Sequence, residues 1–286
     1  MIILPSTDVR HREQALLGLL RRGASKFFVE PLTSLCYRFR YRAISDPAKV
    51  IIVDPTEICF YRDRPPRGSS TAKMRSAAQR FNIQGGDWDR KLHRVTDHFR
   101  YQGLVERFVH GMSWHETVIF QKEVVEKRKI QDFAAKVATF NEKCARRDAL
   151  CESIKRHGVL PSSKLSEDFR EAFDQGSRRN VVVNIGREGM LIFTRKGWHR
   201  LCMAKILGVR NLPVEVDVRH LKWQAIREEI HRSRSYGALS KRARAHLAHP
   251  DLADLVPPCW LTEGQKSEAM NPNSKVGRVN AAPLRT

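Results

Sequence analysis

The chain has 286 residues, of which 41% are hydrophobic and 29% are charged, a mixture typical of one or two globular domains. It has 52 Lys and Arg against 31 Asp and Glu, and the net charge of +21 favours polyanionic partners such as nucleotides or nucleic acid. The spacing of the six cysteines resembles no zinc motif and implies no disulfide framework, which fits a reducing cytoplasm. No apolar run is long enough to span a membrane, so we expect a cytoplasmic protein without a membrane partner. A basic protein without any polyanion partner is the plainer alternative.

The first 45 residues are predicted to contain a helix and a basic strand. Apolar residues recur at helical spacing over 9–24. Aromatic and basic residues alternate over 34–44, which predicts a period-two strand. We interpret it as a half-buried edge strand rather than a nucleic-acid surface. The segment 62–80 is rich in Pro, Ser and Arg and is predicted to be a loop.

The middle of the chain is predicted to be mostly helical. A buried strand over 49–53 and a turn over 54–57 precede it, and a tight turn is expected over 85–89. One helix is expected to end near Gly111, and residues 117–157 read as almost wholly helical. The intervening Ser113-Trp114-His115-Glu116 fits a helix capping box.

Residues 180–232 give the most regular pattern. A β-branched run, a glycine-flanked turn and a second apolar run predict a hairpin, which a loop, a helix ending at Gly208, a strand and an amphipathic helix follow. The corresponding ranges are 180–185, 186–189, 190–193, 194–197, 198–207, 214–218 and 221–232. The last ~25 residues lack periodicity, so a flexible tail is expected there.

A basic loop that runs into a helix is the candidate phosphate-binding site. The first turn of a helix offers unpaired N–H groups and partial positive charge, and glycine allows close approach of the backbone to a ligand. His199 and Arg200 add side-chain donors. The residues assigned to this site are Lys196, Gly197, Trp198, His199 and Arg200. A surface helix with a basic first turn is the alternative.

The order of these elements resembles the ParB/sulfiredoxin superfamily, where a hairpin leads to a G-x-x-R or G-x-H-R loop and a helix. The matching positions are Gly197, His199, Arg200, Ala204, Leu207, Gly208 and Pro213. The resemblance implies an α+β fold: a small mixed sheet with flanking helices and a mostly helical insertion at about 62–147. We therefore divide the chain into 1–45, a core over 46–232, and a basic segment with a tail over 233–286.

The superfamily contains proteins with several activities, and the residues of this motif distinguish among them. Sulfiredoxins place a catalytic cysteine where this chain has Trp198, so sulfiredoxin chemistry is not expected. Segregation-type ParB proteins, which bind CTP, have Glu-Arg-Arg after the glycine, and His199 departs from that pattern, so plasmid segregation is not expected either. Free-serine kinases of this fold have a G-x-H-R loop and bind adenine nucleotide. The resemblance thus implies ATP or CTP, with Mg²⁺, as the ligand.

A phosphotransferase, nucleotide hydrolase or nuclease would need a carboxylate near the phosphate. Asp54 and Glu57 are the candidate base or Mg²⁺ contacts, with His199 as a further catalytic candidate. Asp87 and Asp89 could together hold a hard cation. The alternative is that all four acidic residues cap turns or are solvated.

Residues 219–246 form the candidate nucleic-acid surface, with Arg232, Arg234, Lys241, Arg242 and Arg244 as the contacts. Two functions therefore fit the sequence, beside a scaffold whose pocket is vestigial. One is a nucleotide- or phosphate-binding ParB-like protein that transfers or hydrolyses a phosphoryl group. The other is a non-catalytic basic protein that binds nucleic acid. A solvated basic helix explains residues 219–246 equally well.

Overall fold

The computed structural model describes residues 41–46, 49–62, 82–126, 133–161 and 180–269. The chain divides into two compact units, one up to Gln224 and one from Ala225 onward. The helix predicted over 9–24 and nearly all of the loop predicted over 62–80 lie outside the described residues. The strand predicted over 34–44 also lies mostly outside them, and its described part, 41–44, has no strand.

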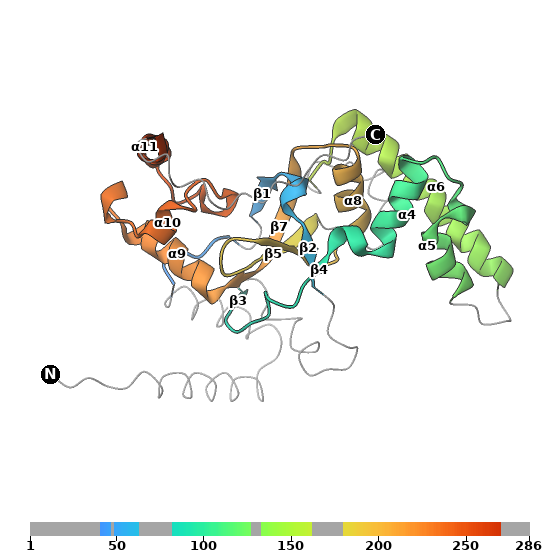
Figure 1. The fold of residues 1–286 in the computed structure, drawn as a ribbon, viewed down its shortest axis with the longest axis horizontal. Coiled ribbons are helices and arrows are strands. Elements are labelled where there is room, and N and C mark those ends of the chain that lie inside the picture. Colours follow the sequence, from blue (N-terminus) through green and yellow to red (C-terminus); the bar gives the residue numbers. More distant parts are fainter. Residues whose placement is uncertain (1–40, 47–48, 63–81, 127–132, 162–179, 270–286) are drawn as a thin grey trace. The chain divides into compact units, whose positions relative to one another are not determined.

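The first unit has an α+β fold built on a mixed, open sheet of seven strands with flanking helices (Figure 1). The strand order is β1-β7-β5-β6-β2-β4, and β3 also pairs with β7. The strands are β1 (Val50–Val53), β2 (Phe60–Tyr61), β3 (Asn82–Gln84), β4 (His93–Arg94), β5 (Val181–Ile185), β6 (Leu191–Phe193) and β7 (Leu212–His220).

Strand β7 organises the sheet because three other strands pair with it. It is antiparallel to β1 and parallel to both β5 and β3. Its alternating valines share one face of the strand and are buried, which suits β-branched side chains packed against a core. The strand is longer than the 214–218 predicted from sequence, because β1 pairs with its first residues and β3 with its last. The predicted strand at 49–53 and the hairpin of β5 and β6 are confirmed.

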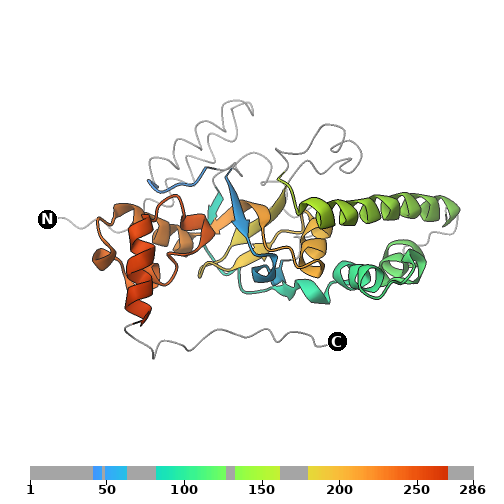
Figure 2. The same ribbon diagram turned by 90° about the horizontal axis from the view of Figure 1, so that it is seen from above.

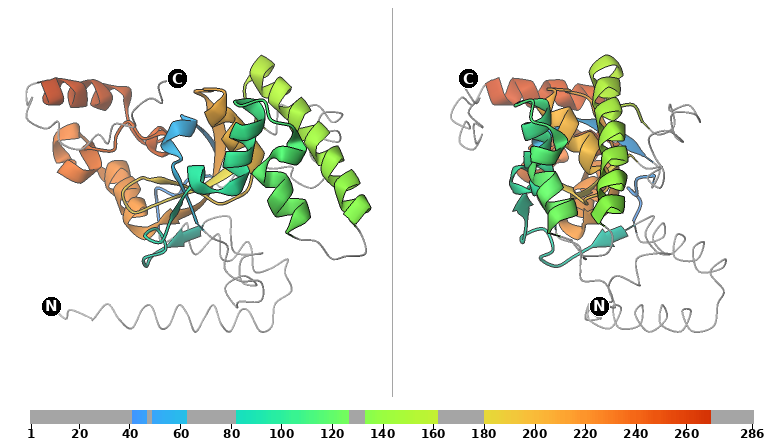
Figure 3. Two further views of the ribbon diagram at one scale, coloured as in Figure 1. Left: turned by 45° about the vertical axis from the view of Figure 1, so that its right-hand side comes forward. Right: turned by 90° about the vertical axis from the view of Figure 1, so that its right-hand side faces the viewer.

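The helices of the first unit include α4 (Phe99–Phe108), α5 (Val118–Phe120), α6 (Phe133–His157) and α8 (Trp198–Ile206). A π-helical segment, Gln121–Val125, continues directly from α5. Figures 2 and 3 show α6 alongside the α5 region, and α8 contacts both α4 and α6. The capping box at Ser113 is confirmed, since its backbone N–H donates to the Glu116 carboxylate at 2.8 Å.

The predicted helical insertion also contributes to the sheet. Along the sequence, strands β3 and β4 both come between β2 and α6. In the sheet, β3 pairs with β7 and β4 pairs with β2. Both are only two or three residues long. Partners distant in the sequence, rather than a local alternating pattern, therefore create them.

The turn predicted over 85–89 is fixed to the β5–β6 hairpin by one arginine. Arg187 donates to Asp89 from its backbone N–H at 2.8 Å and from its guanidinium at 2.6 Å. The same guanidinium donates to Asp87 at 2.7 Å. Asp89 is buried, whereas the Asp87 side chain is 68% exposed. Burial opposes ionisation, but these hydrogen bonds outweigh it and lower the pKa of Asp89 to about 2.

The second unit is helical. Helix α9 (Leu221–Arg232) crosses the unit boundary, and α10 (Lys241–Arg244) and α11 (Pro258–Ala269) follow. The fully buried Arg227 donates to the Asp251 carbonyl and to the Asp254 carboxylate, which satisfies its charge. Helix α11 extends into the stretch where the sequence lacks periodicity, and the buried Trp260 anchors its first turn.

Among the helices that the structure describes, none combines the length and apolar character needed to cross a lipid bilayer.

Replacing Asp89 with Asn is expected to lower the free energy of unfolding by about 1.5–3 kcal/mol, the usual value of hydrogen bonds to a charged group. The matched change Asp87→Asn is expected to cost much less, because its side chain is 68% exposed. Urea unfolding of the two variants measures this difference. Equal losses would contradict the conclusion that Asp89, rather than Asp87, holds the 85–89 turn against the β5–β6 hairpin.

Candidate anion-binding site

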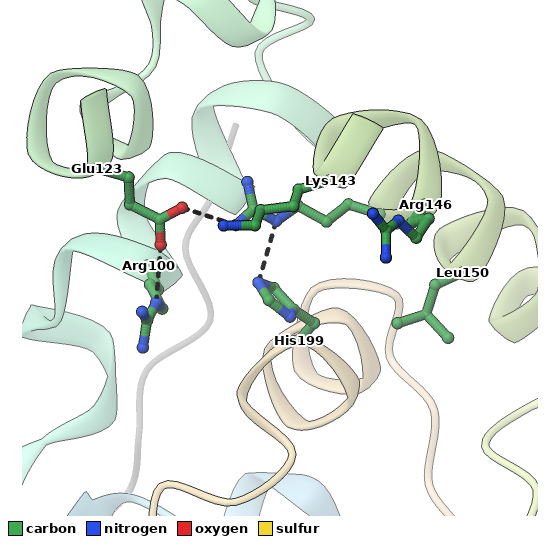
Figure 4. A pocket seen from close by; sticks show the side chains of 7 residues that line it. Arg100, Glu123, Lys143, Arg146, Leu150 and His199 are labelled. Atoms are coloured by element: carbon green, nitrogen blue, oxygen red, sulfur yellow. Dashed lines mark hydrogen bonds and ion pairs between the residues drawn. The ribbon is translucent and has the colours of Figure 1, made fainter. Parts of the chain in front are cut away.

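A cavity of about 330 Å³ in the first unit lies where the insertion meets the start of α8 (Figure 4). Four of its side chains are Arg or Lys, one is a carboxylate, one is His199 and one is apolar. The lining residues are Arg100, Glu123, Lys143, Arg146, Arg147, Leu150 and His199. One residue of the predicted phosphate site, His199, therefore lines the cavity together with six residues that were not among the predicted site residues.

Helix α6 supplies four of these side chains from one face. Lys143, Arg146, Arg147 and Leu150 follow the spacing i, i+3, i+4, i+7, which places them on one side of a helix. This basic stripe is visible in the sequence. Its spacing does not by itself distinguish a ligand-binding face from a solvated basic face of a helix.

Glu123 holds two arginines in place from the opposite wall. Its carboxylate accepts from Arg147 at 2.9 Å and from Arg100 at 3.2 Å, and Figure 4 shows both ion pairs. The side chains of Glu123 and Arg147 are only 13% and 6% exposed. Burial raises the pKa of Glu123, but the two guanidiniums outweigh it and leave that pKa below its ordinary value. Glu123 is therefore an ionised ion-pair partner.

The π-helical segment contains Glu123. In a π-helix the hydrogen bonds run from i to i+5, so the side chains turn to directions that an α-helix would not give them. Such segments are frequent at functional sites.

Arg147 also fixes the imidazole of His199. Its Nε–H donates to Nε2 of His199 at 3.2 Å. Because arginine only donates, Nε2 must be the unprotonated nitrogen, and the neutral ring carries its proton on Nδ1. Burial and the guanidiniums of Arg147 and Arg100 lower the pKa of His199 from 6.5 to about 3. At neutral pH His199 is thus an uncharged donor whose lone pair is already occupied.

The balance of charge in the cavity is positive. Four cations face one carboxylate, and Glu123 already contacts two of them. Lys143 has no carboxylate partner among the described residues. Arg146 has a 3.5 Å contact with Glu142 on its own helix, and the Glu142 side chain is 71% exposed. Lys143 and Arg146 are therefore available to a bound anion.

The other residues of the predicted loop have different surroundings. Gly197 has φ +89°, and a Cβ there would lie 3.1 Å from the Cα of Val181, so close packing against β5 requires the glycine. Trp198 is buried and stacks on His98 with ring centroids 4.1 Å apart. Lys196 and Arg200 are half-buried and do not line the cavity.

The predicted catalytic carboxylates lie near the other end of α8. Asp54 accepts from the Thr56 backbone N–H at 2.8 Å and caps a short 3-10 helix. Lys205 contacts the Thr56 carbonyl there at 3.5 Å. His199 and Lys205 are six residues apart, which is about 9 Å along a helix. Asp54 and Glu57 are therefore not brought together with His199 at the cavity.

The predicted metal pair is likewise separate from the cavity. Asp87 and Asp89 both accept from Arg187, so a guanidinium occupies the position that a cation would take. Within the described ranges, no three His, Cys, Asp or Glu side chains are placed to hold a metal ion. The arrangement does not fit a Mg²⁺ site.

The five candidate nucleic-acid contacts belong to the second unit. Arg232 pairs with Glu228 at 3.5 Å, although its side chain is 67% exposed. Arg244 lies over the ring of Tyr236 and donates to the Gly237 carbonyl at 2.7 Å. Arg234, Lys241 and Arg242 are exposed.

No protein-family model, curated protein or solved structure matches the chain.

The depressed pKa of His199 predicts acid sensitivity of the fold. The unfolded chain takes up a proton below pH 6.5, whereas the folded protein does so only near pH 3, so stability is lost as the pH falls through this window. Between about pH 7 and 5 the contribution is up to about 2 kcal/mol. His199→Gln keeps an acceptor for Arg147 but does not titrate, so its midpoint should fall less over this range. Thermal unfolding at several pH values measures the two slopes, and identical slopes would refute the assignment.

Proposed function

We propose that the protein binds a phosphorylated small molecule whose phosphate group sits in the cavity between α6 and α8. The observation that carries this proposal is the lining of four cationic side chains against a single, already paired carboxylate. A cavity of about 330 Å³ is large enough for a small ligand. Guanidinium groups are well suited to phosphate oxygens because they donate two parallel hydrogen bonds.

The resemblance to the ParB/sulfiredoxin superfamily supports the same proposal. In that superfamily the G-x-H-R motif at the start of the corresponding helix binds nucleotide phosphates, and His199, the histidine of that motif in the first turn of α8, lines the cavity. The α+β sheet with flanking helices is compatible with such a core. ATP or CTP is the ligand that the resemblance suggests.

The side chains around the cavity favour binding over catalysis. A general base needs an available lone pair or carboxylate near the reacting group. The Nε2 lone pair of His199 is occupied by Arg147, and Glu123 is paired with two arginines. Asp54 and Glu57 belong to a short 3-10 helix near the C-terminal end of α8, away from the cavity. We therefore propose a phosphate-binding protein rather than a kinase, nucleotide hydrolase or nuclease.

The double change Lys143→Ala and Arg146→Ala is expected to weaken phosphate binding by about tenfold or more, because it removes the two cations with the least engaged charges. Both positions are on the solvent-accessible side of α6, so the fold should persist. Isothermal titration calorimetry with inorganic phosphate and with ATP measures the change.

The matched control is Lys155→Ala with Arg156→Ala. It removes two positive charges from the same helix at exposed positions that do not line the cavity. Affinity in this control should stay within about twofold of the wild type. Equal weakening in both double variants would mean that overall charge, and not the cavity, binds phosphate.

The second candidate function is nucleic-acid binding by the second unit. It is favoured by the exposure of Arg232, Arg234, Lys241 and Arg242. If Lys241 and Arg242 each contact a phosphate, Lys241→Ala with Arg242→Ala should reduce the slope of log affinity against log salt by about 2. Fluorescence anisotropy with a duplex of random sequence measures this slope. An affinity that barely changes with salt would exclude this function.

A further inference from the structure

Building on the proposed function, we infer that the cavity recognises a compact polyanion with two linked phosphates, such as pyrophosphate, in its metal-free form. The ligand class is set by the charge of the lining, its lack of large aromatic rings and the engagement of its single carboxylate. Each of these features is a property of the seven lining side chains.

The charge of the lining matches two phosphates better than one. Four cations and one carboxylate leave a formal charge of +3, with His199 neutral. One phosphate carries about −1.5 to −2 near neutral pH, so two linked phosphates carry about −3. A single phosphate would leave part of the positive charge in a half-buried site uncompensated, which is unfavourable.

The lining offers no platform for a nucleobase. None of the seven residues is Phe, Tyr or Trp, and Leu150 is the one apolar side chain. Proteins that hold a base commonly stack it on an aromatic ring. The nearby rings of Trp114 and Phe140 lie 5.6 and 5.7 Å from the Arg147 guanidinium, so that cation already covers them. A nucleoside would therefore gain little from this cavity.

The lining also disfavours a Mg²⁺–phosphate complex. Magnesium bound to phosphates is usually held by one or two free carboxylates. Among the described residues that line the cavity, Glu123 is the only carboxylate, and it accepts from Arg147 at 2.9 Å and from Arg100 at 3.2 Å. Mg²⁺ would also lie close to four cationic side chains, and it would neutralise part of the negative charge of the phosphates that these side chains bind. The free anion is therefore the better ligand.

Calorimetry at constant ionic strength tests the inference with pyrophosphate, inorganic phosphate, ATP and CTP, each with EDTA and with excess Mg²⁺. Without metal, pyrophosphate should bind about tenfold or more tightly than phosphate and at least as tightly as either nucleotide. ATP and CTP should differ by less than about threefold, and Mg²⁺ should weaken pyrophosphate binding. Lys143→Ala with Arg146→Ala should abolish the preference for pyrophosphate, and Lys155→Ala with Arg156→Ala should keep it.

Two results would overturn this inference while leaving the proposed function intact. One is a nucleotide that binds about tenfold more tightly than pyrophosphate, and the other is binding that requires Mg²⁺. If none of the four compounds binds, or if both double variants bind like the wild type, the proposed function itself is wrong.

Discussion

The guanidinium of Arg147 connects three elements that are far apart in the sequence. From α6 it reaches Glu123, 24 residues earlier, and His199, 52 residues later. Its side chain is only 6% exposed, so its charge depends on these partners for stabilisation. Together with Arg100 it keeps Glu123 ionised, and it adds to burial, the larger cause, in lowering the pKa of His199. Arg147 therefore positions Glu123 and His199, while Arg100, Lys143 and Arg146 supply the rest of the positive charge of the cavity.

Patterns local to the chain were enough to predict much of the first unit. The β5–β6 hairpin, β1, α8 and α9 follow from alternation, glycine stops and helical spacing. Strands β3 and β4 were missed because each is two or three residues long and is created by pairing with a distant strand. Helix α11 was missed because its exposed residues carry no clear period, and burial of Trp260 identifies its inner face only in the folded unit.

The candidate site was predictable only in part. The loop before α8 was selected, and His199 does line the cavity. Gly197 and Trp198 instead serve packing, against Val181 and His98 respectively. Apart from Leu150, the remaining cavity residues come from the insertion, and local spacing does not bring Arg100, Glu123 and Arg147 together. The basic stripe on α6 was the one available signal, and recognising it requires knowing that another helix faces it.

Nitrogen NMR of the His199 ring tests the central claim most directly, with His199→Gln providing the assignment. The account predicts a neutral ring with its proton on Nδ1 at pH 6, and a change in the ring signals when pyrophosphate is added. A ring that titrates near 6.5 and does not respond to pyrophosphate would contradict both the contact with Arg147 and the assignment of the cavity as an anion site.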